Sequence, residues 1–160
     1  MTAVDRFRVT LMAALLAPAV WAGPREEAQA AYESFFPAFA VGNQQAVAAL
    51  FAPDAQFYGT LTPEVVTTPD AVLQYFTRSL SGPATVKAES LGSASLVISD
   101  HVVAIAGKWR LERTVDGKTT PFGPFRITTV LARRGDRWQI VQFHNSPLPA
   151  PAAPTAAASR

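Results

Sequence analysis

The periodicity of the chain changes from helical to strand-like near Ala84, and this change limits the possible folds more than any other feature of the sequence. From there on, apolar and polar residues alternate in four stretches. The predicted strands span 84–98, 101–113, 119–133 and 137–145. Asp116-Gly117 is the dipeptide most typical of a two-residue hairpin turn, and Arg134-Gly135-Asp136 predicts a second tight turn. We therefore expect four long strands in one antiparallel sheet.

Helical periodicity dominates the chain before these strands. Apolar and aromatic residues between 28 and 39 recur at helical spacing, which predicts an amphipathic helix that Pro37 kinks or ends. A short helix is expected after Gly42-Asn43, and Thr68-Pro69 is typical of the start of another. Residues 55–61 predict a short strand between these helices. This order predicts an α+β fold, a cone in which one curved antiparallel sheet wraps over N-terminal helices.

Both ends of the chain differ in composition from this folded unit. Arg6 and Arg8 precede an apolar stretch that is typical of a secretory signal peptide. The stretch is short for a bilayer span and contains Pro18, so we expect no stable membrane span after cleavage. The C-terminal end is rich in proline and alanine, which predicts a disordered tail. The expected division is a signal peptide at 1–22, one domain at 23–148 and a tail at 149–160, in a periplasmic or secreted protein.

Composition excludes several classes of function. The apolar fraction of 49% and the charged fraction of 16% fit a globular domain. A net charge of +2 without a cluster of basic residues predicts no nucleic-acid partner. The absence of cysteine excludes thiol nucleophiles and disulfides. His101 and His144 are too few and too far apart in the sequence for a metal site, so we expect no metal and no cofactor.

Three segments carry a resemblance to a known family. Residues 41–55 (VGNQQAVAALFAPDA) resemble the second-helix segment of the nuclear-transport-factor-2-like superfamily, and residues 125–130 (FRITTV) and 138–147 (WQIVQFHNSP) resemble its last two strands. The ending His-Asn-Ser-x-x-Pro is similar to that of SnoaL-like proteins and of bacterial relatives of the calcium/calmodulin-dependent kinase II association domain. The resemblance covers residues 27–148. It implies a cone-shaped domain that forms a homodimer or higher homo-oligomer through its outer sheet face.

The resemblance also implies which strand residues face the inside of the cone. The sets assigned to the concave side are Val103, Ile105, Gly107, Trp109 and Leu111; Arg126, Thr128 and Val130; and Trp138, Ile140, Gln142 and His144. Gly107 beside Trp109 leaves room for a ligand or for a bulky neighbour. The predicted ligand-binding residues are Arg126, His144, Tyr58, Trp109, Thr128, Ser146 and Gln142.

His144 and Arg126 are the candidates for chemistry. An imidazole at the rim or floor of the cone can transfer protons near neutral pH, or can simply be satisfied by a backbone carbonyl. An arginine on an apolar strand face needs a partner, because an unpaired buried charge is costly. That partner is either a ligand carboxylate or phosphate held by two hydrogen bonds, or a structural acid such as Glu112 or Asp54.

Three functions remain open at this point, because the superfamily includes isomerases, cyclases, dehydratases, epoxide hydrolases, binding modules and oligomerisation hubs. The first is a small-molecule-binding or oligomerisation module whose cone takes a small anionic or aromatic ligand. The second is a cofactor-independent isomerase, dehydratase or cyclase, in which His144 is the general base and Arg126 stabilises an oxyanion. The third is an assembly unit whose own side chains fill the cone. Glu89 and Glu112 are predicted to point outward, so no inward pair of acids favours the enzyme.

Overall fold

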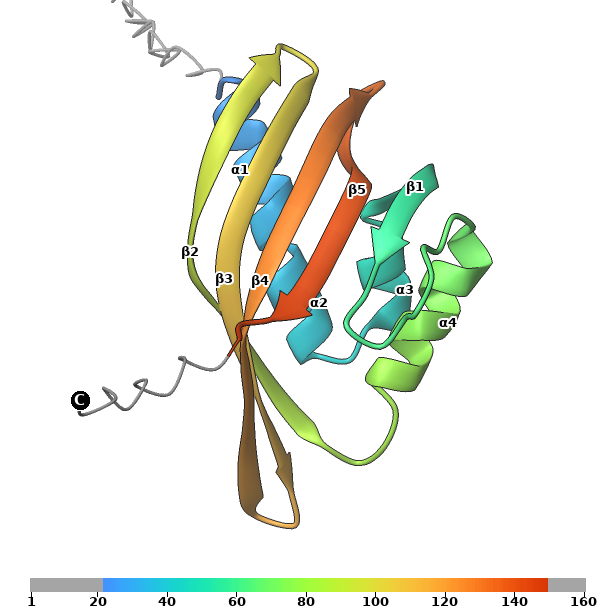
Figure 1. Ribbon diagram of the computed structural model, residues 1–160, viewed down its shortest axis with the longest axis vertical. Helices are drawn as coiled ribbons and strands as arrows, with labels where there is room; N and C mark the ends of the chain where they lie inside the picture. The colour runs from blue at the N-terminus through green and yellow to red at the C-terminus, as the bar shows by residue number, and fades with distance from the viewer. Residues whose placement is uncertain (1–21, 150–160) are drawn as a thin grey trace, which may run out of the picture.

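The computed structural model describes residues 22–149, and within them five strands form one mixed sheet in the order β1-β5-β4-β3-β2 (Figure 1). The strands are β1 (Phe51–Tyr58), β2 (Thr85–Ser99), β3 (Val102–Val115), β4 (Lys118–Arg134) and β5 (Arg137–Pro147). The four long strands pair antiparallel, whereas β1 pairs parallel with β5. The sheet is not closed, because β1 and β2 are its edges. The expected α+β cone is confirmed.

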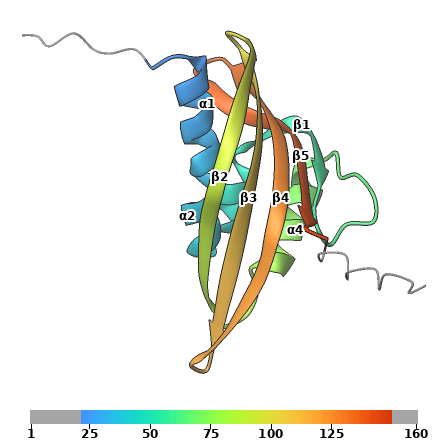
Figure 2. The same cartoon turned by 60° about the vertical axis from the view of Figure 1, so that its left-hand side comes forward.

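The helices lie on the concave side of this sheet (Figure 2). They are α1 (Pro24–Glu33), α2 (Phe35–Ala40), α3 (Gln44–Ala48) and α4 (Pro69–Ser79). The break between α1 and α2 falls at Ser34, within one turn of Pro37, which has no backbone N–H to bond the carbonyl of Glu33. At the start of α4, Thr68 Oγ1 accepts a hydrogen bond from the Ala71 backbone N–H at 3.4 Å, as the Thr-Pro pair predicts.

Aromatic side chains fill the space between helices and sheet. The buried rings of this core are Tyr32, Phe35, Phe36, Phe39, Phe51, Phe57, Phe76, Trp109 and Phe143. Phe57 of β1 stacks on Phe143 of β5, with ring centroids 5.1 Å apart and planes at 9°. Burying one such ring contributes roughly 1.5–3 kcal/mol, so this cluster holds β1 and the helices against the sheet.

The strand boundaries show one correction. The four long strands agree with the predicted ranges within two residues at each end. The short strand is different, because β1 begins at Phe51 rather than at residue 55 and ends at Tyr58. Pro53 lies inside it, and its lack of an N–H is tolerated because β1 is an edge strand whose pairing with β5 is irregular between Phe51 and Gln56.

The predicted signal peptide up to residue 21 and the predicted tail from residue 150 lie outside the described residues. Within residues 22–149, no helix has the length and apolar character needed to cross a membrane.

Candidate functional site

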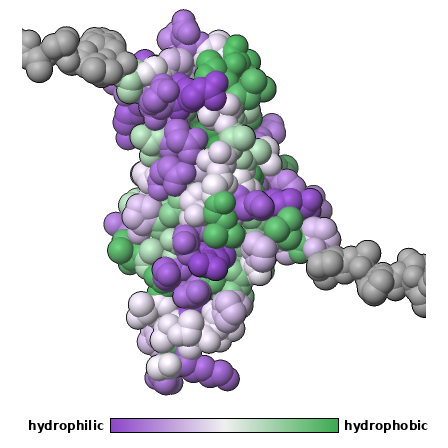
Figure 3. All heavy atoms as spheres, turned by 90° about the vertical axis from the view of Figure 1, so that its left-hand side faces the viewer, coloured by the Kyte–Doolittle hydropathy of each residue, from purple (hydrophilic) through white to green (hydrophobic). Residues whose placement is uncertain are grey.

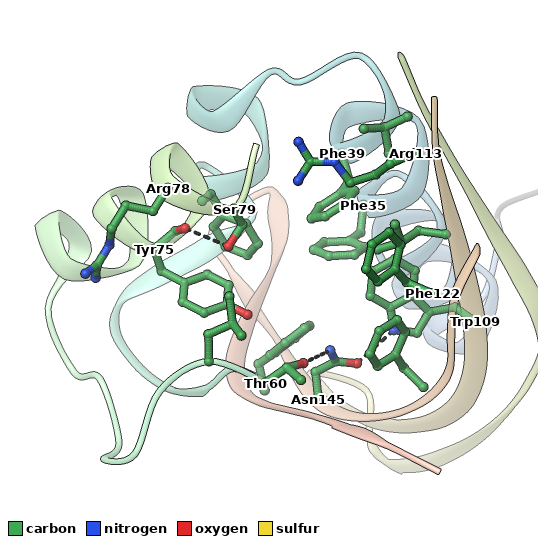
Figure 4. Close-up of a pocket in the computed structure, with 16 residues that line it drawn as sticks. Phe35, Phe39, Thr60, Tyr75, Arg78, Ser79, Trp109, Arg113, Phe122 and Asn145 are labelled. Carbon is green, nitrogen blue, oxygen red and sulfur yellow. Dashed lines mark hydrogen bonds between the residues drawn. The ribbon is translucent and has the colours of Figure 1, made fainter. Parts of the chain in front are cut away.

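The concave side of the sheet holds a cavity of about 290 Å³ (Figure 4). Its walls come from α2, α4, the β1–α4 loop and strands β2 to β5. The lining residues are Phe35, Phe39, Thr60, Leu61, Tyr75, Phe76, Arg78, Ser79, Val86, Trp109, Leu111, Arg113, Phe122, Phe125, Phe143 and Asn145. Leu61 and Phe122 are 75% and 43% exposed, so the cavity reaches the surface at these two residues. Half of the other lining residues are aromatic, and with Val86 and Leu111 they make the interior mainly apolar.

A short hydrogen-bonded chain forms the polar part of the cavity wall. Trp109 Nε1 donates to Asn145 Oδ1 at 2.8 Å, and Asn145 Nδ2 donates to Thr60 Oγ1 at 2.6 Å (Figure 4). Asn145 is buried, and a buried amide is stable only when its polar atoms are bonded. Thr60 accepts this bond and retains its own hydroxyl hydrogen for another acceptor. The chain therefore fixes a polar spot in an otherwise apolar wall.

Tyr75 adds a second polar group to the cavity. Its ring lies against Phe57, with centroids 4.7 Å apart, and against the backbone of Gly59. A Cβ at Gly59 would lie 2.6 Å from two carbon atoms of the Tyr75 ring, so only glycine allows this approach. Burial raises the pKa of the Tyr75 hydroxyl, and hydrogen bonds to Ser79 and Thr60 partly offset that rise. Tyr75 is therefore a neutral phenol that can donate or accept a hydrogen bond.

Two arginines stand at the edge of the cavity, and they point in different directions. Figure 4 shows the guanidinium of Arg113 at the edge, on the side of α4, and that of Arg78 directed away from the cavity. Arg113 Nη2 donates to the backbone carbonyl of Ser81 at 3.1 Å. The described residues that line the cavity include no carboxylate and no imidazole.

The predicted inner face of β3 is confirmed. Val103, Ile105 and Trp109 are buried, and Trp109 lines the cavity. The space beside Gly107 is occupied by Tyr32. Its hydroxyl lies 2.6 Å from the position that a Cβ of residue 107 would take.

The predicted inner face of β4 is wrong by one residue. Arg126 and Thr128 are exposed on the outer face, while Ile127 and Thr129 are buried. The strand register explains this, because β3 pairs its inward residues with the odd-numbered residues of β4: Trp109 with Phe125, Gly107 with Ile127 and Ile105 with Thr129. An inward Arg126 would also bury a charge without compensation, because the residues opposite it on the neighbouring strands are Lys108 and Ser146. Thr129 is satisfied because its Oγ1 donates to the Gln142 carbonyl at 2.7 Å.

The predicted inner face of β5 is correct only in its first half. Ile140 is buried, but a bulge at Val141 follows, because Leu131 of β4 pairs with Ile140 and Val130 pairs with Gln142. One extra residue reverses the alternation, so Gln142 and His144 point outward. Phe143 and Asn145 occupy the inner face instead and line the cavity.

The remaining predicted ligand-binding residues gather on the outer face of β1, β5 and β4. Tyr58 is 39% exposed, its hydroxyl donates to the Pro63 carbonyl at 2.8 Å, and its ring contacts the His144 ring edge-on with centroids 5.9 Å apart. His144 pairs with Thr128, and Ser146 pairs with Arg126. None of these residues lines the cavity, and of the predicted set only Trp109 does. Whether the outer cluster binds a ligand stays a prediction.

The suggested acidic partners of Arg126 lie elsewhere, because Glu112 of β3 is opposite Pro121 and Asp54 is bound to another arginine. Asp54 pairs with Arg134, with Oδ2 and Nη2 2.9 Å apart, and this guanidinium lowers the pKa of the Asp54 carboxyl. In the described part of the chain, no group of three or more metal-ligating side chains comes together.

The sequence interpretation missed Tyr75, Thr60, Arg113 and the inward direction of Asn145. Arg113 was detectable, because it continues the inward series of β3 by two residues beyond Leu111. Tyr75 lies next to Phe76 on α4, and its approach to Gly59 depends on contacts between distant segments. Asn145 faces inward only because of the bulge, which leaves no signal in the local sequence.

Comparison with known proteins decides the family. The model of the SnoaL-like domain matches residues 28–151. The chain belongs to the SnoaL-like family. No curated protein matches this SnoaL-like chain. It is similar to the solved structure of a proposed calcium/calmodulin-dependent protein kinase II association domain from Xanthomonas campestris, with 28% identity over 89% of this chain and 98% of that one and a TM-score of 0.70.

Two further solved structures share the fold of this SnoaL-like domain. One is a proposed dehydratase of the nuclear-transport-factor-2-like family from Streptomyces avermitilis, with 16% identity over 79% of this chain and 96% of that one and a TM-score of 0.69. The other is a protein from Catenulispora acidiphila in complex with S-DNPA, with 18% identity over 75% of this chain and 90% of that one and a TM-score of 0.66. At these identities the likeness is one of fold.

Proposed function

We propose that this SnoaL-like domain binds a small, largely apolar molecule in the cavity of its cone. The observation that supports this most is the cavity itself, which combines aromatic walls with a few polar groups, at Tyr75 and at the Asn145–Thr60 pair. Ligand sites are typically concave and apolar with a few placed polar groups that orient the ligand. Fold relatives include a protein solved in complex with S-DNPA, which supports ligand binding by a protein of this fold.

Filling the cavity tests this proposal. Val86 is half-buried on β2 and lines the cavity, whereas Leu96 on the same strand is 66% exposed on the outer face. We expect the neutral probe 1-naphthamide to quench the fluorescence of Trp109 and to raise the unfolding midpoint of the wild-type protein. Val86→Phe should abolish both effects, and the matched variant Leu96→Phe should retain both. Equal binding by Val86→Phe and the wild type would show that the probe does not occupy the cavity.

An isomerase, dehydratase or cyclase is the second candidate, and the proposed dehydratase from Streptomyces avermitilis is the observation that favours it. His144 as its general base has little support, because this residue is exposed on the outer face of the sheet. An enzyme working in the cavity would depend on the neutral Tyr75 phenol as its proton donor. Turnover of a cavity ligand that survives His144→Ala and is lost in Tyr75→Phe would favour this candidate over simple binding.

We also propose that the protein is a homodimer or higher homo-oligomer that works in the periplasm or outside the cell. The outer face of the sheet exposes Leu96 and Ile98 of β2, which are 66% and 59% accessible. Figure 3, which views the molecule from the side of β2, shows apolar surface gathered towards its upper end. The location is supported by the signal-peptide pattern, and recovery of the protein from the cytoplasm with Met1 still attached would contradict it.

A further inference from the structure

We propose that the ligand of this cone is an amphiphilic anion, with an apolar or aromatic body in the cavity and a carboxylate bound by Arg113 at its edge. This inference rests on the proposed binding function and names the class of ligand. It assigns the anion to a residue different from Arg126 and His144, which the sequence favoured and which are both exposed on the outer face.

Arg113 lies where a carboxylate at the end of an apolar ligand would arrive. It follows Trp109 and Leu111 on the inner face of β3, and all three line the cavity. Its side chain is half-buried and reaches towards α4, where Nη2 donates to the Ser81 carbonyl. A guanidinium carries five N–H donors, so this single bond fixes the side chain and leaves donors for a ligand. Guanidinium groups bind carboxylates through two parallel hydrogen bonds.

The charges around Arg113 favour an anion. The ion pairs of the described residues join Arg110 to Glu89, Arg133 to Glu27 and Arg134 to Asp54, and Arg113 is in none of them. Among the described lining residues, the charged side chains are Arg78 and Arg113, so no acid lines the cavity. Asp116 lies near Arg113 in a separate surface pocket, together with the cationic Lys118.

The apolar surroundings strengthen the attraction at this position. Val86 of β2 lies opposite Arg113, and Phe122 of β4 lies opposite Leu111, so these apolar side chains of the cavity wall keep part of the water away from Arg113. A charge–charge contact in such partly dry surroundings is stronger than the same contact in bulk water. The Asn145–Thr60 pair, in contrast, is uncharged and can hydrogen-bond a neutral group of the ligand, so the cavity distinguishes two ends of the molecule.

The test compares two probes that share one ring system and differ in charge. Binding of 1-naphthoate and of 1-naphthamide is measured by titration calorimetry for the full chain and for Arg113→Gln, Arg113→Lys and Arg110→Gln. Arg110 is the matched control, because it lies on the same strand, is exposed, and is held by Glu89 at 2.8 Å. Retained binding of 1-naphthamide reports that each variant still has an intact cavity.

We expect Arg113→Gln to lower the affinity for 1-naphthoate by about tenfold or more and to leave the affinity for 1-naphthamide unchanged. Arg113→Lys should recover part of the loss, because it restores the charge but not the planar pair of donors. Arg110→Gln should change neither affinity. The proposal is overturned if Arg113→Gln changes the affinities for both probes equally or changes neither of them. The cavity would then bind the probes without an anion site at Arg113. If the wild-type protein binds neither probe, the proposed function itself fails, and this inference fails with it.

Discussion

Among single residues, Tyr32 has the least satisfied polar group in the described part of the chain. Its side chain is buried, and its hydroxyl has no hydrogen-bond partner there. The hydroxyl occupies the space above Gly107, where a Cβ would lie only 2.6 Å away. The ring contributes to the aromatic core, while the oxygen has lost its contact with water without gaining a bond in exchange.

Removing this oxygen should therefore cost nothing. We expect Tyr32→Phe to leave the free energy of unfolding unchanged near neutral pH, or to raise it by up to about 1 kcal/mol, as measured by urea denaturation. Burial, followed by the charge of Glu33, raises the pKa of Tyr32 far above its usual 10.0. Above about pH 10 the unfolded chain loses the phenol proton first, so the free energy of unfolding falls as the pH rises further.

The same variant also changes this pH dependence. Tyr32→Phe should reduce the loss of stability that occurs above about pH 10, as measured by urea denaturation at increasing pH. A destabilised Tyr32→Phe near neutral pH would mean that the hydroxyl has a partner, such as an internal water molecule.

At the scale of elements, one carboxylate links α1 to the hairpin formed by β4 and β5. Glu27 Oε2 accepts a hydrogen bond from Trp138 Nε1 at 2.8 Å and lies 3.3 Å from Arg133 Nη1. These groups are partly shielded from water, so the bond to the indole contributes more than a fully exposed contact would.

We expect Trp138→Phe, which keeps an aromatic ring and removes the donor, to lower the free energy of unfolding by about 1 kcal/mol. The Glu27→Ala variant removes the acceptor. If the two groups act as a pair, the double variant loses less stability in urea denaturation than the sum of the single variants. Additive losses would show that the contact between α1 and the hairpin contributes nothing measurable.

The elements themselves were largely predictable, because the signals that create them are local. Strand alternation, the Asp116-Gly117 turn and the Thr68 cap act within a few residues and appear in the structure where expected. The faces of the last two strands were not predictable in this way. They depend on the pairing of Trp109 with Phe125 and on the bulge at Val141, which arise only when distant strands meet.

The candidate site was less predictable for the same reason. Its polar groups come from the β1–α4 loop, from α4, from β3 and from β5, and no short motif joins them. Trp109 was identified because the apolar alternation of β3 is regular. Arg126 and His144 were selected for their chemistry, and chemical type alone does not say on which face of a strand a side chain lies.

At the scale of the whole molecule, the cone has two surfaces for which we propose different tasks. The concave side encloses the cavity, and the outer face of the sheet exposes the apolar residues that we propose contact a second copy. We expect sedimentation equilibrium to give at least twice the mass of one chain. A charge introduced by Leu96→Glu on the outer face should shift the protein towards the monomer. Leu61→Glu, at an equally accessible leucine beside the cavity, should leave the mass unchanged, and a monomeric wild type would contradict the expected assembly.

The bulge at Val141 also bears on how this protein can change over generations. The bulge is a single extra residue, and because of it the Asn145 amide rather than the His144 imidazole faces the inside of the cone. Deletion of Val141 would restore the regular pleat and leave Phe143 and Asn145 on the inner wall, because Gln142 would then follow Ile140 directly and point outward. The strand can therefore gain or lose this one residue over generations while the same side chains continue to line the cavity.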